Sequence, residues 1–95
     1  MKNSLAVIVP FFNEEKTIES SLRRLIKVDI VQQIICVDDC SKDKSLEIVK
    51  QIKKEDTRIE IILNKVNSGK GNAITSAKKY VNTSHVTIHD ADLEY

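Results

Sequence analysis

The sequence contains few of the residues that interrupt regular secondary structure. Its 95 residues include one proline, Pro10, and two glycines, Gly69 and Gly71. Because glycine and proline are the main breakers of helices and strands, their scarcity predicts regular elements along most of the chain. The two glycines flank a single residue, which marks that stretch as a place of special backbone requirements.

Cysteines and long apolar runs are also scarce. Cys36 and Cys40 form no Cys-x-x-Cys motif, and no second pair completes a zinc site, so we expect reduced thiols in a cytosolic protein. No apolar run approaches the ~18 residues that cross a bilayer. We therefore expect a cytoplasmic location, at the cytoplasmic face of a membrane if a longer protein contains this chain.

The chain lacks an excess of either charge. Fifteen Lys and Arg residues against fourteen Asp and Glu residues give a formal net charge of +1 at pH 7. Nucleic acids and anionic membranes are bound through basic surfaces, so the balance supports neither, and we expect no nucleic-acid partner. The composition of 41% apolar and 31% charged residues is typical of one globular domain, spanning 1–95.

Four short runs rich in Val and Ile alternate with three segments of helical periodicity. The runs cover 5–9, 34–37, 59–63 and 85–88, and we expect them to be buried strands. Between them apolar residues recur at helical spacing, as in Ile18, Leu22 and Leu25. The alternation predicts an α/β fold, a Rossmann-like βαβαβαβ three-layer sandwich with a mostly parallel sheet. Ligands bind such sheets at the carboxyl ends of the strands.

Acidic residues follow the second run directly. Asp38 and Asp39 are paired carboxylates, which can accept hydrogen bonds from ribose hydroxyls or from a base N–H group. Ser41 and Asp43 suit the cap of the next helix, and we prefer that interpretation for both. Two adjacent acids exceed what a cap needs, so we predict that Asp38 contacts a ligand.

Acidic residues also follow the fourth run. Asp90 and Asp92 lie two apart, so in an extended segment both point to one side and form an oxygen site for Mg²⁺ or Mn²⁺. Glu94 continues the alternation as a third ligand. Such a cation would bridge a diphosphate. His85 and His89 have no spacing that requires a metal, and His89 is close enough to Asp90 to support it indirectly.

Two other loops leave alternatives open. The segment 67–72 is either an anion site, with Lys70 on a phosphate, or a flexible turn with a solvated lysine; it lacks the spacing of a Walker loop. After the first run, Glu14 and Glu15 suit the positive end of a helix dipole. Of Phe11 and Phe12, one can stack on a nucleobase and the other belongs to the core.

Four stretches together resemble family 2 glycosyltransferases. Residues 7–15 resemble the Val-Ile-Pro-x-Tyr-Asn-Glu opening of that family, with Phe12 in place of Tyr. Residues 37–43 resemble Val-Asp-Asp-Gly-Ser-x-Asp, with Cys40 in place of Gly. Residues 67–73 resemble Asn-x-Gly-Lys-Gly-x-Ala.

The fourth stretch narrows the resemblance. Residues 90–94 are similar to the Asp-Ala-Asp-Leu-Gln of the polyprenyl-phosphate sugar transferases, the dolichol-phosphate-mannose-synthase-like group, with Glu94 in place of Gln. The resemblance implies a GT-A fold, a UDP- or GDP-sugar donor, and a polyprenyl phosphate or saccharide acceptor in cell wall or polysaccharide biosynthesis. It implies a Mn²⁺ or Mg²⁺ site at Asp90, Asp92 and Glu94. The donor site would comprise Pro10, Phe12, Glu14, Asp38, Asp39, Lys70 and Asp90.

The length of the chain limits these expectations. A full domain of this family needs roughly twice this many residues, so we expect 1–95 to be its N-terminal half, holding donor and metal residues but no convincing catalytic base. A metal-dependent, inverting transfer is the leading hypothesis, with a non-catalytic nucleotide-sugar-binding fragment as the alternative. A response-regulator receiver fits poorly, because Pro10 and Asn64 occupy its acidic positions. An exposed edge at the last strand would allow a homodimer.

Overall fold

The computed structural model describes residues 4–66 and 69–89, with the backbone alone for Lys70. Four strands alternate with three helices in the predicted order. The elements are β1 (Leu5–Phe11), α1 (Ile18–Ile26), β2 (Val31–Asp38), α2 (Ser45–Glu55), β3 (Ile59–Leu63), α3 (Lys70–Lys78) and β4 (His85–Ile88).

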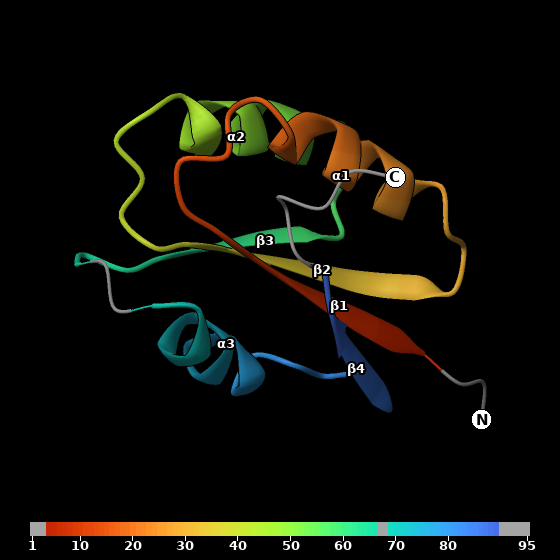
Figure 1. Ribbon diagram of the computed structural model, residues 1–95. Coiled ribbons are helices and arrows are strands. Elements are labelled where there is room, and N and C mark those ends of the chain that lie inside the picture. Colours follow the sequence, from red (N-terminus) through yellow and green to blue (C-terminus); the bar gives the residue numbers. More distant parts are fainter. Residues whose placement is uncertain (1–3, 67–68, 90–95) are drawn as a thin grey trace.

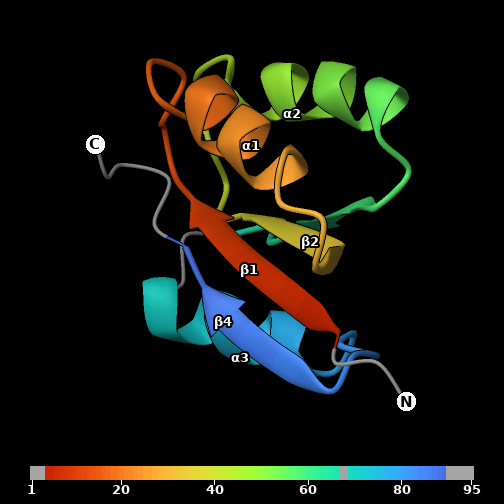
Figure 2. The same cartoon turned by 90° about the vertical axis from the view of Figure 1, so that its right-hand side faces the viewer.

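The strands form one parallel sheet with the order β3-β2-β1-β4. Helices α1 and α2 cover one face of it and α3 covers the other, so the molecule has three layers (Figures 1 and 2). The chain moves outward from β1 to β3 and then returns to place β4 on the free side of β1. Because crossovers are right-handed, this reversal puts α3 opposite α1 and α2. The predicted α/β sandwich is confirmed.

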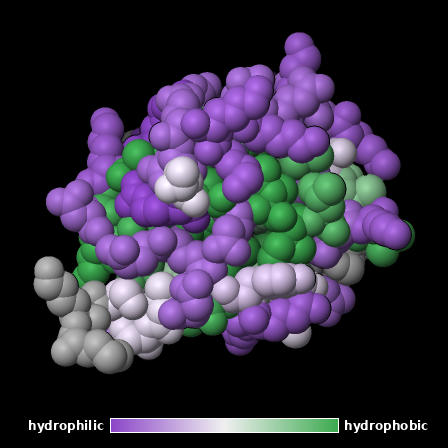
Figure 3. All heavy atoms as spheres, turned by 180° about the vertical axis from the view of Figure 1, so that it is seen from behind, coloured by the Kyte–Doolittle hydropathy of each residue, from purple (hydrophilic) through white to green (hydrophobic). Residues whose placement is uncertain are grey.

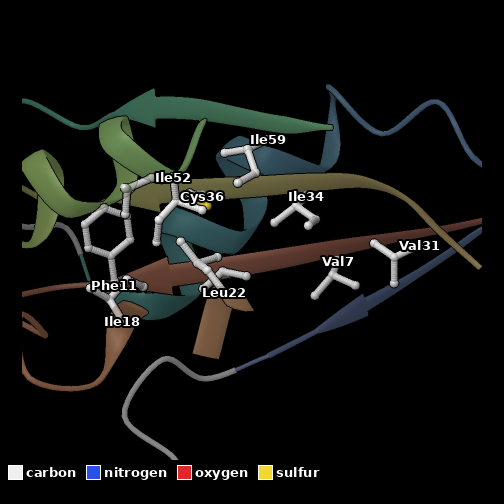
Figure 4. Packing of buried hydrophobic residues seen from close by; sticks show 11 residues of the cluster. Val7, Phe11, Ile18, Leu22, Val31, Ile34, Cys36, Ile52 and Ile59 are labelled. Carbon is white, nitrogen blue, oxygen red and sulfur yellow. The ribbon is translucent and has the colours of Figure 1, made fainter. Parts of the chain in front are cut away.

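The core lies on both faces of the central strands. In β1 every residue from Ala6 to Phe11 is buried, because β2 and β4 flank the strand and helices cover both of its faces. Toward α1 and α2, Val7, Val9 and Phe11 pack with helix side chains such as Leu22 (Figure 4). Toward α3, Ile8, Ile35 and Val37 pack against Ala73 and Ala77. These two alanines, spaced four apart, allow α3 to approach the sheet closely.

The elements differ from the sequence expectation at four places, of which the first is β1, which continues two residues past the predicted run, to Phe11. All four residues of β4 are exposed, so the prediction of a buried fourth strand is wrong. Its apolar composition fits a buried strand, but only β1 flanks it within the described residues. Strand β2 begins earlier than predicted, at Val31. The spacing of Ala73, Ala77, Tyr80 and Val81 predicts a helix that reaches Val81, but α3 ends at Lys78 and the last two of these residues follow it in a turn.

The topology fixes where a ligand can bind. The strand order reverses at β1, since β2 and β3 are added on one side of it and β4 on the other, and in open α/β sheets ligands bind beside the carboxyl ends at such a reversal point. The loops after β1, β2 and β3 all leave from this edge, because the strands are parallel. Within the described residues, no helix has the length and apolarity needed to cross a membrane.

Candidate functional site at the carboxyl edge of the sheet

Asn13 joins the loop after β1 to the loop after β2. Its backbone has φ = 52°, a left-handed conformation that asparagine tolerates better than most residues. Its side-chain Oδ1 accepts hydrogen bonds from the backbone N–H groups of Lys42 at 2.7 Å and Asp43 at 3.3 Å. Its own N–H group donates to Ser41 Oγ at 3.0 Å. One residue therefore fixes the spacing of two loops at the site edge.

A second set of hydrogen bonds runs between the same loops. The N–H group of Glu14 donates to Ser45 Oγ at 2.7 Å, and that of Glu15 donates to Asp43 Oδ2 at 3.1 Å. Asp43 Oδ1 also accepts the N–H group of Ser45, the first residue of α2, at 2.9 Å. Desolvation alone would raise the pKa of Asp43, but the hydrogen bonds from Ser45 and Glu15 hold it below its usual value. Asp43 therefore serves both α2 and the neighbouring loop.

The preferred interpretation of Ser41 as a cap of α2 is wrong. Its hydroxyl accepts the Asn13 N–H group instead, and α2 begins four residues later, at Ser45. For Asp43 only part of the interpretation is confirmed: its carboxylate accepts the first N–H group of the helix. The N-cap position itself is occupied by Lys44 without a side-chain bond.

Asp38 lies at the end of β2 with only 4% of its surface exposed. Its Oδ1 accepts the Ser41 N–H group at 2.8 Å, and its backbone carbonyl accepts the Asn64 N–H group at 2.9 Å. Its other carboxylate oxygen, Oδ2, accepts no hydrogen bond within the described part of the chain. The carboxylate is thus oriented by the loop that follows β2, while the backbone of Asp38 is bonded to the loop that follows β3.

Asp39 is equally buried but its carboxylate is engaged at both oxygens. Oδ1 accepts the side-chain Nδ2 of Asn64 at 3.1 Å, and Oδ2 accepts the backbone N–H group of Gly69 at 2.9 Å. Gly69 has φ = 88°, which favours glycine, and stands directly before α3. Asp39 therefore positions the start of α3, and a direct role on a ligand stays a prediction.

Cys40 adopts a left-handed backbone with φ = 69°. Its Sγ lies 3.3 Å from the carbonyl oxygen of Lys65, so the side chain contacts the loop after β3. Glycine is common at this position in the family that the sequence resembles, and the positive φ gives a physical reason, because glycine adopts it without a steric cost. Cys36 is fully buried, as predicted, and desolvation raises its pKa to about 12.

The remaining predicted residues of the first loop divide between core and surface. Pro10 is buried inside β1, and Phe11 is part of the core. Phe12 is 40% exposed, so it is the phenylalanine that can present a ring to a ligand. Glu14 accepts the Thr17 hydroxyl at 3.3 Å, and its carbonyl accepts the N–H group of Ile18 at the start of α1.

The predicted metal ligands Asp90, Asp92 and Glu94 lie outside the described residues, as does the side chain of Lys70. Residues 4–66 and 69–89 contain no group of three acidic, histidine or cysteine side chains that could hold a metal. The last described residue, His89, donates its N–H group to the Ile8 carbonyl at 2.9 Å, which keeps it beside β1 at the reversal point. Its ring Nε2 is buried and has no hydrogen-bond partner in that part of the chain.

Sequence reasoning missed Asn13, Ser41 and Ser45 as residues that shape the site. They contribute through side-chain bonds to backbone groups in a loop 28 to 31 positions away. The available signal was an asparagine two residues after the end of a strand, because asparagine is enriched at left-handed positions. Nothing in the sequence identified the loop to which it bonds.

Comparisons with known proteins agree with this geometry. The family model described as "Glycosyl transferase family 2" matches residues 6–95 of this chain. An uncharacterized glycosyltransferase of Synechocystis sp. is 34% identical over 98 residues, covering 99% of this chain and 31% of that protein. Dolichyl-phosphate beta-glucosyltransferase ALG5A of Trichomonas vaginalis is 33% identical over 97 residues, covering 93% of this chain and 30% of that protein.

Two solved structures share the fold. The mannosyltransferase PcManGT from Pyrobaculum calidifontis, in complex with GDP-Man and Mn²⁺, matches with a TM-score of 0.88 and 25% identity, covering 97% of this chain and 28% of that one. S. aureus TarS 1–349 in complex with UDP-GlcNAc matches with a TM-score of 0.86 and 32% identity, covering 94% and 26%. The chain spans about a third or less of the length of these proteins. Its sequence and its α/β architecture place it in glycosyl transferase family 2, with the GT-A fold.

Proposed function

We propose that this chain forms the donor-binding part of a glycosyltransferase that uses a UDP- or GDP-sugar. The observation that carries the proposal is the arrangement of Asp38, a buried carboxylate at the carboxyl edge of the sheet, beside the end of β1, that is oriented by the Ser41 N–H group. A carboxylate oriented in this way can accept hydrogen bonds from ribose hydroxyls or a base N–H group. The GDP-Man and UDP-GlcNAc complexes of PcManGT and TarS support a nucleotide-sugar donor.

The nucleoside would bind against Pro10, Phe12, Glu14 and Asp38. The exposed ring of Phe12 offers an apolar face for a base, and Asp38 Oδ2 provides an acceptor without a partner in the described part of the chain. We assign Asp39 to this site through its bond to the Gly69 N–H group, which positions the start of α3 and hence the backbone of Lys70.

The sugar diphosphate would be held by Lys70, Asp90 and a divalent cation bound to Asp90, Asp92 and Glu94. The chemistry of the donor set fits, since carboxylate oxygens are the ligands that Mg²⁺ and Mn²⁺ take in proteins. His89 lies beside β1, so the chain enters the acidic segment at the reversal point. When bound, the cation would neutralise charge on the diphosphate leaving group. The Mn²⁺ complex of PcManGT supports this choice of ion.

We assign the acceptor to polyprenyl phosphates or saccharides, used in cell wall or polysaccharide synthesis, with inversion at the sugar carbon. A phosphate acceptor is already anionic, so it needs no general base, whereas a hydroxyl acceptor does. We expect no residue of this chain to act as such a base. The name of the Trichomonas relative supports a lipid phosphate, which would place a longer protein at the cytoplasmic face of a membrane.

Calorimetric titration of the chain with UDP and GDP, with and without Mn²⁺, tests the donor proposal. We expect Asp38→Ala to weaken nucleotide binding at least tenfold in both conditions, about 1.4 kcal/mol. Asp92→Ala should remove only the part of the affinity that depends on Mn²⁺. Asp29→Ala, an exposed acid before β2 at the opposite edge, is the matched control and should change nothing.

Two results would reject parts of the proposal. Unchanged Mn²⁺-dependent affinity in Asp92→Ala would remove the metal assignment, and absence of UDP and GDP binding by the unsubstituted chain would remove the donor assignment. Turnover of labelled UDP- or GDP-sugar separates an enzyme from the second candidate, a non-catalytic nucleotide-sugar-binding fragment. Binding without turnover would favour the fragment.

A further inference from the structure

The outer edge of β3 is apolar and open. Strand β3 has β2 on one side and no strand on the other within the described residues. Apolar side chains gather along the face that contains this edge, between the two helical layers (Figure 3). Leu63 is 57% exposed and Val66 is 69% exposed, and Ile61 and Ile62 are half-buried. Edge strands normally carry charges, prolines or bulges that discourage pairing.

The hydrogen bonds of β3 show which backbone groups remain available. Ile34 N–H donates to the Arg58 carbonyl, and Asn64 N–H donates to the Asp38 carbonyl. Because a parallel strand alternates its bonding direction, residues 58, 60, 62 and 64 face β2, while 59, 61 and 63 face outward.

Residue 59 is already protected at this edge. Its N–H group donates to the Asp56 carbonyl at 3.3 Å, and its carbonyl accepts Lys53 Nζ at 2.8 Å. No hydrogen bond in the described part of the chain uses the N–H and C=O groups of Ile61 or Leu63. The open portion of the edge is therefore confined to these two residues.

The charge of the strand does not oppose pairing. Glu60 is its only charged residue, and its Oε2 accepts Gln33 Nε2 at 2.6 Å, which holds the carboxylate against β2. The open portion, from Ile61 to Leu63, contains no charged side chain. The edge therefore fits a partner strand that is itself short, apolar and uncharged.

We propose that a second copy of this chain pairs antiparallel with β3, with Ile62 on the two-fold axis. In this register Ile61 lies opposite Leu63 of the second copy, and four backbone hydrogen bonds satisfy the open groups of both strands. The opposed side chains are all apolar: Ile61 with Leu63, and Ile62 with Ile62. Glu60 meets the neutral Asn64, so no like charges are opposed. The carboxyl edges point in opposite directions, which leaves both donor sites open.

The β4 edge is a poorer match for a second copy. Strand β4 presents Val86 and Ile88 on one face but His85 and Thr87 on the other. The open part of β3 is apolar on both faces: Ile61 packs toward α1 and α2 and Ile62 toward α3, and the alternation of a strand places Leu63 on the face of Ile61. Self-pairing through β3 therefore buries more apolar surface per residue than self-pairing through β4.

Sedimentation velocity and light scattering on the chain, over a wide range of concentration, test the interface. We expect a species of twice the monomer mass. Leu63→Lys should convert the dimer to the monomer, because pairing would place a lysine of each copy among the apolar side chains of Ile61 and Ile62. Ile88→Lys adds the same charge at the opposite edge, where the side chain is 47% exposed, and should leave the dimer intact.

Disulfide trapping tests the register and does not depend on a lysine in the strand. In a Cys40→Ser background, Ile62→Cys places two thiols opposite each other in a non-hydrogen-bonded pair, about 4.5 Å apart at Cα, which a disulfide accommodates. Air oxidation should therefore link the copies. Glu60→Cys on the same face would lie far from its counterpart and should stay monomeric on denaturing gels.

Three results would overturn the proposal. A monomer at all concentrations would do so directly. A dimer lost in Ile88→Lys but kept in Leu63→Lys would move the interface to β4. Cross-linking of Glu60→Cys without cross-linking of Ile62→Cys would contradict the register and the symmetric pairing that it requires.

Discussion

Asn13 Oδ1 lies 2.7 Å from the backbone nitrogen of Lys42, so a side chain of one loop supports the backbone of the next. The bond joins segments 29 positions apart at the carboxyl edge of the sheet. Binding sites gain affinity when their groups are already ordered, because less conformational entropy is lost on binding. The bond therefore belongs to the geometry of the donor site as well as to the stability of the fold.

Asn13→Ala should lower both stability and nucleotide affinity. The substitution removes two hydrogen bonds, each worth about 0.5 to 1.5 kcal/mol. It also leaves alanine in a left-handed conformation that costs about 1 to 2 kcal/mol. Urea unfolding should show a loss of about 2 to 5 kcal/mol, the sum of these terms, and calorimetry should show weaker UDP or GDP binding.

Two matched variants separate the conformational cost from the bridge. Asn13→Asp keeps an acceptor oxygen and tolerates positive φ, so it should recover most of the stability. Asn13→Gly relieves the conformation but removes the bridge, so it should be more stable than Asn13→Ala while binding nucleotide as poorly. Equal affinity of Asn13→Gly and the unsubstituted chain would show that the bridge does not order the site.

Asp39→Ala should release the loop after β3. Its two carboxylate oxygens hold Asn64 Nδ2 and the Gly69 N–H group, and the loss of a charged acceptor costs about 1.5 to 3 kcal/mol per bond. Hydrogen exchange should therefore accelerate at the first amides of α3. In Asp38→Ala the same amides should stay protected, because Asp38 bonds Ser41 instead. Similar exchange in the two variants would contradict this division of roles.

The order of the elements and the location of the site at the carboxyl edge of the sheet could be predicted from the sequence, because both follow from the spacing of apolar runs. Helix positions such as Ile18 and Leu22 are buried as the periodicity predicts. Periodicity failed at β4, since burial of a strand depends on its neighbours as well as on its own residues. It also could not find the Asn13 bridge, because that contact depends on how two loops meet in space.

Cys40 is in a conformation that suits glycine, which makes its substitutions informative. At φ = 69°, Cys40→Gly should relieve strain but lose the contact of Sγ with the Lys65 carbonyl. We expect a net change within about 1 kcal/mol, since the two effects are similar in size. Cys40→Val should be destabilising by more than that, because a β-branched residue is strongly disfavoured at positive φ. Thermal unfolding of the two variants checks the order, and a Cys40→Val more stable than Cys40→Gly would contradict it.

The lowered pKa of Asp43 predicts how the interlocked loops respond to acid. Its pKa is lower in the folded protein than in the unfolded chain, where it is about 3.9. The unfolded state therefore binds the proton first as pH falls, so the stabilisation is complete above the unfolded pKa and is lost as pH falls through the folded one. Asp56, whose pKa is lowered by Arg58, acts in the same direction.

Comparison of the unsubstituted chain with Asp43→Asn isolates the contribution of Asp43, because Asp56 is common to both proteins. The stability difference between the two should be constant from pH 7 to pH 5 and should shrink below about pH 4. A difference that stays constant down to pH 2, measured by urea unfolding, would show that the charge of Asp43 does not hold the two loops together.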